Sequence, residues 1–385
     1  MLELAIKGSK KYYGWVTALL LIIGIGFLVY LKQLNVGLGI TGMSRDVTWG
    51  FYIANFTFLV GVAAGGVMVV LPYYLHDYKA FGRITILGEF LAIAAVIMCV
   101  TFILVDLGQP MRVFNVFIYF SPRSVLFWDT IVLNGYLFLN LLVGWNVLEA
   151  ERNGVHYRAW LKPFIYLSIP WAVSIHTVTA YLYCGLPGRG FWMTAILAPR
   201  FLASAFAAGP AFLILLCMIV RKTTDFDPGK EQIQSLAKIV AYAICINVFF
   251  FLCEVFVAFY SNIPEHMVHL KYLYAGLHGH TLLVPWMWAS LIFMGIGIVL
   301  LVNPVTRKNE SVLIVACIVI FIGTYIDKGL GMISGGFVPN PLHHINEYWP
   351  TLPEAMIALA VWALGLLVLT VLFKIAIGVK EEVQA

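Results

Sequence analysis

Charged residues are scarce in this sequence, and their scarcity excludes a soluble protein. Only 11% of the 385 residues are Asp, Glu, Lys or Arg, whereas 62% are hydrophobic, and the mean hydropathy is +0.91. Soluble domains carry about 25% charged residues. The composition therefore predicts a protein that resides in a membrane. The formal net charge of +5 is explained by basic loop residues, so no nucleic-acid partner is expected.

Sequence motifs for redox metals are missing as well. There are six cysteines, but no CxxC pair, no CxxCH haem-attachment signature and no ferredoxin-type spacing. The cysteines lie in apolar runs or at the end of one: Cys99, Cys184, Cys217, Cys245, Cys253 and Cys317. We interpret them as small buried residues and expect no haem, iron–sulfur cluster or other metal in this chain. If electrons move here, another subunit must carry the metal.

A cleavable signal sequence and the alternation of a β-barrel are both absent. Lys7, Lys10 and Lys11 precede a first apolar run that lacks a small-residue cleavage site and continues into the fold. Runs of about 20 apolar residues can cross a ~30 Å hydrocarbon core as helices. The runs are 13–33, 51–73, 84–105, 125–147, 160–183, 199–220, 239–260, 281–302, 311–328 and 355–376. The sequence thus predicts an all-α polytopic membrane bundle of ten transmembrane helices, a single integral membrane domain over residues 1–385.

The distribution of basic residues predicts how the bundle is oriented. Ten spans place both termini on one side of the membrane. If that side is the cytoplasm, 16 of the 24 Lys and Arg residues lie on the inner side and 8 on the outer side. By the positive-inside rule, both termini are predicted to be cytoplasmic, in a multi-pass protein of the cytoplasmic membrane.

Small residues predict two places where helices pack closely. The second span carries Gly61, Ala64 and Gly65 at i, i+3, i+4 spacing, and the sixth contains the small-residue segment Ala203–Phe212. Within lipid, such residues let helix backbones approach one another. We expect these spans to pack closely against neighbouring helices.

The loops on the predicted outer side are the more elaborate ones. Residues Thr41–Gly50, TGMSRDVTWG, place Arg45, Asp46 and Trp49 at a membrane boundary. A Trp at this level usually anchors the interface, whereas the charge pair belongs either to a polar turn or to a site. The longest loop, residues 329–354, contains Trp, Tyr, His and Pro and is predicted to be an ordered outer cap on which a partner sits.

A histidine-rich loop follows the seventh span, and its function stays open between two interpretations. Its histidines are His266, His269, His278 and His280. Their spacing is compatible with a metal, but no companion cysteines or acidic cluster completes a recognisable site. An interface role is favoured.

Polar side chains inside the predicted spans, or directly at the end of one, are candidates for function. They are Asn55, Glu89, Asp106, Asp129 and Glu254. Glu89 lies near the inner surface, where it either belongs to a proton path or is simply reached by water. Asp129 lies about one helical turn below the outer surface, and Arg112, Arg45 or Arg123 are its candidate partners.

The fifth span carries a polar stripe in its outer half. His176 is the histidine most clearly inside a span, and Thr177 and Tyr183 follow it. His176 and Tyr183 are seven residues apart and share a helical face. A lone buried histidine is often only a hydrogen-bonded structural residue, but the flanking hydroxyl groups favour a stripe that faces a ligand.

Four motifs carry a family resemblance. They are TGMSRDVTWGFYIANFTFLVGVAAGG, DLGQPMR, FWD and SIHTVTAYLYCGLPGRGFW. Over all ten spans the sequence resembles the NrfD-like family of polysulfide-reductase-type quinone-interacting membrane subunits. Within that family it is similar to the membrane subunits of Dsr-type complexes of sulfate-reducing microbes, also called Hdr-like menaquinol oxidoreductases.

The resemblance implies a function in anaerobic respiration. Such a subunit holds menaquinone as its bound substrate near the outer face, beside an extracytoplasmic ferredoxin-like iron–sulfur subunit, and some relatives are suspected of moving protons. Dsr-type complexes also contain a multihaem cytochrome c, a haem b membrane subunit and a cytoplasmic heterodisulfide-reductase-like subunit. One departure from the family is that the first span of this sequence has no histidine. A quinone pocket that uses a histidine of the first helix therefore has no counterpart here.

Quinone turnover moves two protons as well as two electrons, so its head group needs ionisable partners. We therefore expect residues 51–183 to form a quinone-binding four-helix bundle and residues 199–302 a second helical bundle. His176 and Asp129 are the predicted catalytic pair, with Arg45 and Arg112 setting their charge, and Glu89 and Glu254 are predicted for a proton path. The remaining predicted quinone-binding residues are Asp46, Asn55, Asp106, Thr177 and Tyr183.

Two other functions compete with this one. A secondary transporter or ion-conducting protein favours discontinuous helices and a site near the middle of the membrane, with comparable loops on both sides. A cytochrome b-type anchor needs pairs of axial histidines on its helices, and one intramembrane histidine does not ligate two haems.

Overall fold

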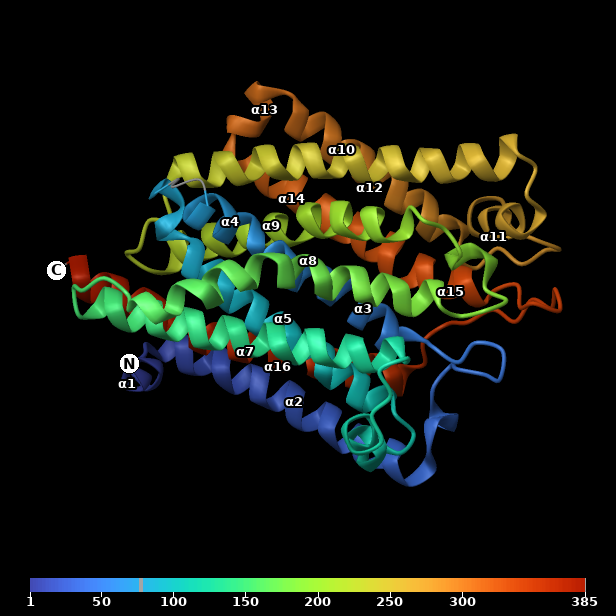
Figure 1. Cartoon of the computed structure of the whole chain (residues 1–385), viewed down its shortest axis with the longest axis horizontal. Helices are drawn as coiled ribbons and strands as arrows, with labels where there is room; N and C mark the ends of the chain where they lie inside the picture. The colour runs from blue at the N-terminus through green and yellow to red at the C-terminus, as the bar shows by residue number, and fades with distance from the viewer. Residues whose placement is uncertain (76–78, 385) are drawn as a thin grey trace.

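The computed structural model describes residues 1–75 and 79–384, which form one bundle of long helices running along a common direction (Figure 1). Within these residues, ten segments are helical, long and apolar enough to cross a membrane, which confirms the prediction. They are α2 (Lys10–Val36), α3 with α4 (Phe51–Gly65 and Val67–Leu75), α5 (Thr85–Asp106), α7 (Val125–Arg152), α8 (Lys162–Cys184), α9 (Leu197–Thr223), α10 (Lys230–Tyr260), α12 (Val284–Val302), α14 with η6 and α15 (Glu310–Tyr325, Ile326–Gly331 and Met332–Phe337) and α16 (Leu352–Gln384). Short helices α1 (Leu2–Ile6), α6 (Asn115–Ile118), α11 (Pro264–Tyr274) and α13 (Pro304–Lys308) lie between or before them.

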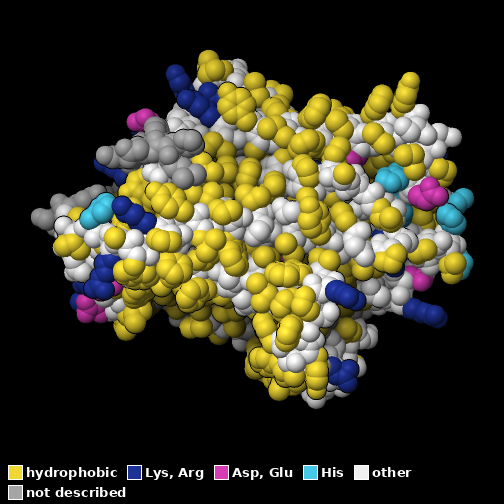
Figure 2. All heavy atoms as spheres, in the orientation of Figure 1, with side chains coloured by type: hydrophobic (Ala, Val, Ile, Leu, Met, Phe, Trp, Pro, Cys, Tyr) yellow, Lys and Arg dark blue, Asp and Glu magenta, His cyan; other side chains and the backbone are white. Residues whose placement is uncertain are grey.

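The surface of the bundle is that of a multi-pass membrane protein. Figure 2 shows hydrophobic side chains over most of the middle of the molecule, with charged side chains and histidines mostly toward its two ends. Both termini lie at the same end (Figure 1), as an even number of spans requires. The assignment of that end to the cytoplasm stays a prediction from the basic residues.

Helix α3 is the centre of the bundle. In its span 94% of the most apolar window is buried, against 11% for α2 at the periphery. Helix α3 packs against α5, α8 and α9, while α2 packs mainly against α16. The helices of residues 51–183 are neighbours, since α5 also packs on α7 and α7 on α8. Because α9 packs directly on α3, however, the two predicted bundles share one continuous core.

Two glycines make the crossing of α3 and α9 possible. A Cβ atom on Gly65 would lie 2.6 Å from the Cα atom of Gly209 and 2.9 Å from the carbonyl oxygen of Ala205. These are the small-residue segments that the sequence predicted to pack closely. Such backbone contact supplies the dispersion energy that holds helices together in lipid, where burial of apolar surface gives no driving force.

Replacing Gly65 by Ala is expected to destabilise the bundle by about 1–3 kcal/mol, because the new methyl group forces the two backbones apart. Gly24→Ala is the matched control, since no atom of the described residues lies within 4 Å of a Cβ atom at Gly24 on α2. Thermal unfolding in detergent should show a lower Tm for Gly65→Ala only. Equal Tm values for the two variants would contradict the packing argument.

The ninth span is longer than the sequence predicted. We expected it to end at residue 328 and the cap loop to begin at 329, but the helix continues through the π-helical segment η6 and α15 to Phe337. The loop therefore runs from Val338 to Thr351. Asp327 and Lys328 had indicated a helix end, but both side chains are buried and find partners inside the bundle.

Candidate functional site

The loops at the end opposite the termini are joined around Glu354. Its carboxylate accepts hydrogen bonds from the backbone N–H groups of Gly42, at 3.1 Å, and Phe51, at 3.2 Å, and from the hydroxyl group of Tyr348, at 2.5 Å. Phe51 is the first residue of α3, so a negative charge sits where the positive end of the helix dipole lies. The buried Glu354 thus fixes the TGMSRDVTWG stretch against the cap loop, a role that sequence analysis missed.

Asp46 strengthens the same junction. Its carboxylate accepts hydrogen bonds from the side-chain amide groups of Asn340, at 3.1 Å, and Asn346. Both asparagines belong to the cap loop, so the predicted quinone-binding residue Asp46 holds two loops together in this structure. Its sequence neighbour Arg45 is exposed.

Aromatic rings form a layer beneath these loops. The ring of Trp49 lies 5.5 Å from that of Tyr183, 6.0 Å from that of Trp192 and 5.8 Å from that of Phe337, between centroids. Trp192 donates a hydrogen bond of 2.9 Å to the carbonyl oxygen of Met332. The layer brings together three regions far apart in the sequence and separates the polar interior from the loops.

His176 lies under this layer, fully buried on α8. Its ring and that of Tyr183 both pack against Phe201, at 5.3 and 6.0 Å between centroids, so the two side chains share a face as predicted. The hydroxyl group of Tyr183 is hydrogen-bonded to that of Thr57 on α3. Helix α8 therefore presents its polar stripe to α3 and α9, in the middle of the bundle.

Asp129 on α7 is also buried, and α8 links it to His176. Its carboxylate accepts a hydrogen bond of 2.6 Å from the hydroxyl group of Thr179, which is one turn from His176. Tyr183 lies near enough to Asp129 and Asp106 for their charges to act on it. The predicted pair is thus positioned by one helix face, although its two members do not contact one another through any hydrogen bond in the described residues.

The nearest partner of His176 is a lysine that sequence analysis did not select. Nε2 of His176 contacts Nζ of Lys328 and lies 2.7 Å from the carbonyl oxygen of Phe201. A carbonyl oxygen only accepts, so Nε2 either carries a hydrogen and donates it to the Phe201 carbonyl or is unprotonated and accepts a hydrogen bond from Nζ of Lys328. Nδ1 of His176 is buried without a hydrogen-bond partner in the described residues. This arrangement allows a proton to be held at either nitrogen of the His176 ring.

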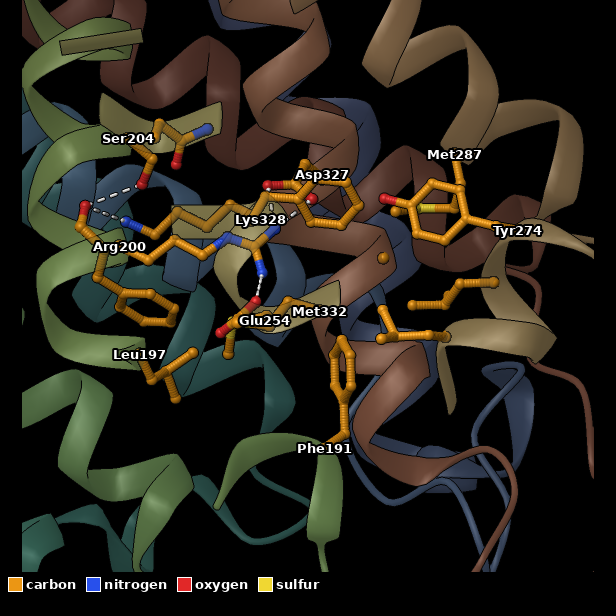
Figure 3. Close-up of a pocket in the computed structure, with 16 residues that line it drawn as sticks. Phe191, Leu197, Arg200, Ser204, Glu254, Tyr274, Met287, Asp327, Lys328 and Met332 are labelled. Atoms are coloured by element: carbon orange, nitrogen blue, oxygen red, sulfur yellow. Dashed lines mark hydrogen bonds and ion pairs between the residues drawn. The ribbon is translucent and has the colours of Figure 1, made fainter. Parts of the chain in front are cut away.

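A buried ion cluster adjoins Lys328 (Figure 3). Arg200 on α9 donates to both carboxylate oxygens of Asp327, at 2.8 and 2.9 Å, and pairs with Glu254 on α10. Gly61 of α3 makes room for the neighbouring lysine, since a Cβ atom there would lie 2.9 Å from Nζ of Lys328. Arg200 and Lys328 are therefore the basic residues of the site. The predicted ones, Arg45 and Arg112, are exposed, where water hydrates their charges.

A cavity of about 20 Å³ borders this cluster, between α9, α10, α11, α12 and η6 (Figure 3). That volume suits about one water molecule. It is smaller than a quinone ring, so a head group enters this cavity only if the lining side chains move apart.

The other predicted residues have different surroundings. Asn55 has hydrogen-bond partners within the bundle. Its amide oxygen accepts hydrogen bonds from the hydroxyl group of Tyr325, at 3.0 Å, and from the indole N–H of Trp362, at 2.8 Å. The hydroxyl group of Thr177 bonds the Val173 carbonyl of its own helix at 2.9 Å. By contrast, Asp106 and Glu89 each keep one buried carboxylate oxygen without a partner among the described residues. These two remain candidates for ligand or proton contacts.

The histidine-rich segment has partners of its own. Burial lowers the pKa of His269 to about 4, and its Nδ1 lies 3.1 Å from the carbonyl oxygen of Val338. His280 lies 3.0 Å from the carboxylate of Glu347. These contacts attach α11 and the following turn to the cap loop, and an interface role for this segment stays a prediction.

Comparison with known proteins identifies the family. The family model described as polysulphide reductase, NrfD, matches residues 39–338, which include the aromatic layer, His176 and the ion cluster. The chain belongs to the NrfD family.

Relatives of this NrfD-family chain are membrane subunits of oxidoreductases. One from Halobacterium salinarum, named as a "putative dimethyl sulfoxide reductase membrane subunit", is 27% identical, covering 84% of this chain and 77% of that protein. The Hdr-like menaquinol oxidoreductase integral membrane subunit of Archaeoglobus fulgidus is 24% identical, covering 77% and 73%. The menaquinone reductase integral membrane subunit of Nitratidesulfovibrio vulgaris is 21% identical, covering 95% and 91%. The chain is therefore similar to integral subunits of multi-subunit oxidoreductase complexes.

Proposed function

We propose that this chain is the menaquinone-interacting subunit of a respiratory complex and that it binds menaquinone or menaquinol near the end of the bundle opposite the termini. The observation that carries the proposal is the buried contact of His176 with Lys328, beside Asp129 and beneath the aromatic layer. Two relatives carry menaquinol or menaquinone in their names, which supports the choice of quinone. The positive-inside rule makes that end the outer one.

The residues present fit a quinone head group chemically. A quinol supplies two electrons and two protons when it is oxidised, so its oxygens need hydrogen-bond partners that also accept protons. Nδ1 of His176 and one oxygen of Asp106 are buried and unpartnered in the described residues, and Asp129 offers a second buried carboxylate. In this proposal Tyr183, which is near both carboxylates, orients the head group, and the aromatic layer excludes water from it.

The proposed role of Lys328 is to control where the proton resides. A cationic Lys328 beside His176 disfavours a second positive charge on the imidazole, while a neutral Lys328 leaves it free to take a proton. Arg200 stays charged because it is paired with Asp327 and Glu254. In this proposal Glu254 belongs to a proton path at the end of the bundle opposite the termini. Glu89, which has a carboxylate oxygen unpartnered in the described residues, belongs to a second proton path toward the termini.

Electrons must leave through another protein. The proposed partner is an extracytoplasmic ferredoxin-like iron–sulfur subunit that docks on the cap loop and on the segment of α11, since both lie above the aromatic layer. The multihaem cytochrome c, the haem b subunit and the cytoplasmic heterodisulfide-reductase-like subunit implied by the resemblance complete the proposed complex.

The direct test is menaquinol oxidation in membranes that contain the chain with its partner subunits. Oxidation of a water-soluble menaquinol analogue should reduce an electron acceptor at a rate that depends on this chain. Membranes with the partners but without the chain are the control. Equal rates in both would contradict the proposal, and ion-driven solute uptake by the purified chain would favour a transporter instead.

Cross-linking tests the docking surface. A photoreactive residue introduced at the exposed His343 in the cap loop should cross-link to an iron–sulfur protein. The matched control is the exposed Val305 in α13, near the opposite end, which should not reach that protein. Cross-links from Val305 alone would place the electron-transfer partner on the wrong side for this model.

A further inference from the structure

A second cavity lies beside the one at the ion cluster. It has a volume of about 70 Å³ and is lined by α10, α11, η5 (Gly190–Trp192) and the residues between η5 and α9. Glu254, Phe191 and Leu270 line both cavities. His266 lines only the second one and belongs to α11, at the end opposite the termini (Figure 1). The two cavities thus follow one another from the loops to the ion cluster, with Glu254 between them.

The ion cluster is not fully enclosed by the protein. The side chain of Glu254 is 15% exposed and that of Arg200 13%, although both lie within helical spans. Charged side chains at membrane depth face either a paired interior or a water-filled space. One carboxylate oxygen of Glu254 pairs with Arg200. The second cavity, which Glu254 also lines, has room for more than one water molecule beside the carboxylate.

We propose that the two cavities form a water-filled vestibule through which Glu254 exchanges protons with the aqueous phase at the end of the bundle opposite the termini, with His266 at its mouth. The proton-transfer role rests on the proposed function, but the presence of water does not. Glu254 takes a proton from hydronium to become a carboxylic acid and releases water, and the reverse step returns the proton.

The ion cluster suits this exchange. Glu254 is acted on by Arg200 of α9, Asp327 of η6 and His266 of α11. When Glu254 is protonated, Arg200 keeps both of its hydrogen bonds to Asp327. The guanidinium group is therefore never left unpaired, and the cluster changes its charge by one without being disrupted.

A native cysteine allows the vestibule to be tested. Cys253 lines the second cavity and is seven residues, or about 10 Å of helix, from the end of α10. Cys245 is on the same helix, also partly exposed, but about 12 Å deeper and outside both cavities. Cys99, Cys217 and Cys317 are buried. A thiol reacts as its thiolate, which forms in water and not in lipid.

The experiment compares two full-length variants in sealed membrane vesicles of both orientations. Cys184→Ser with Cys245→Ser retains Cys253, and Cys184→Ser with Cys253→Ser retains Cys245. A charged, membrane-impermeant methanethiosulfonate should modify Cys253 at least about tenfold faster than Cys245, and only from the side opposite the termini. Equally slow modification of both cysteines would overturn the vestibule.

The same labelling separates the vestibule from the proposed function. Modification of Cys253 should block the vestibule and lower the rate of menaquinol oxidation about tenfold or more, because removing a proton-transfer step costs at least that much. The Cys245 variant, treated identically, should keep its rate. Modification of Cys253 without any loss of rate would overturn the proton-exchange role. If the untreated chain oxidises no menaquinol, the proposed function fails, while the labelling ratio still decides whether the vestibule holds water.

Discussion

Asp129→Asn and His176→Gln are each expected to lower menaquinol-dependent electron transfer by about 10²- to 10⁴-fold, the usual cost of losing a positioned acid or base. Both replacements keep the approximate shape of the side chain, so the buried hydrogen bonds to Thr179 and to the Phe201 carbonyl need not be lost. The effect should therefore fall on proton acceptance and leave folding largely intact. Rates in membranes, normalised to the amount of assembled complex, measure it.

Thr130→Val is the matched control for this experiment. Thr130 follows Asp129 on α7, but within the described part of the chain its hydroxyl group donates only to the Leu126 carbonyl of its own helix, at 2.9 Å. Its replacement should leave the rate unchanged. If Asp129→Asn and His176→Gln also assemble and oxidise menaquinol at the parental rate, the two residues are structural, and the quinone site must be sought first around Glu254 and the second half of the bundle.

Arg200→Met is expected to destabilise the protein by about 3–5 kcal/mol, because it leaves two buried carboxylates, Glu254 and Asp327, without their cation. Little of the variant should accumulate in the membrane, and what does accumulate should have a lower Tm. Adding Glu254→Gln and Asp327→Asn removes the uncompensated charges and should restore part of the lost stability. Accumulation and Tm are readouts that do not depend on quinone chemistry.

An exposed arginine provides the comparison. Arg152 pairs with Glu382 and Glu3 near the termini, and its side chain is 30% exposed. Solvent screens such pairs, so Arg152→Met should cost at most about 1 kcal/mol. A loss as large as that of Arg200→Met, or a triple variant no more stable than Arg200→Met alone, would show that the ion cluster does not hold α9, α10 and η6 together.

Sequence patterns predicted the helices well because each apolar run has the length of a membrane crossing and no competing structure is available to the backbone in lipid. They also located His176 and Tyr183 on one face, since seven residues make two helical turns. The prediction of the ninth span was wrong, because two charged residues were interpreted as the end of the helix. Asp327 and Lys328 interrupt an apolar run that continues to Phe337, and that continuation was the one signal available for placing them inside the membrane.

The membrane location, the ten spans, their small-residue contacts and the polar stripe on α8 all followed from the sequence alone, because length, periodicity and residue size act locally along the chain. Only the tertiary structure decided which charges meet. Arg200, Glu254 and Asp327 lie on three different elements, and Lys328 reaches His176 across 152 positions of sequence. A buried charge is tolerated only beside its partner, and that pairing depends on which helices are neighbours, information that no single segment carries.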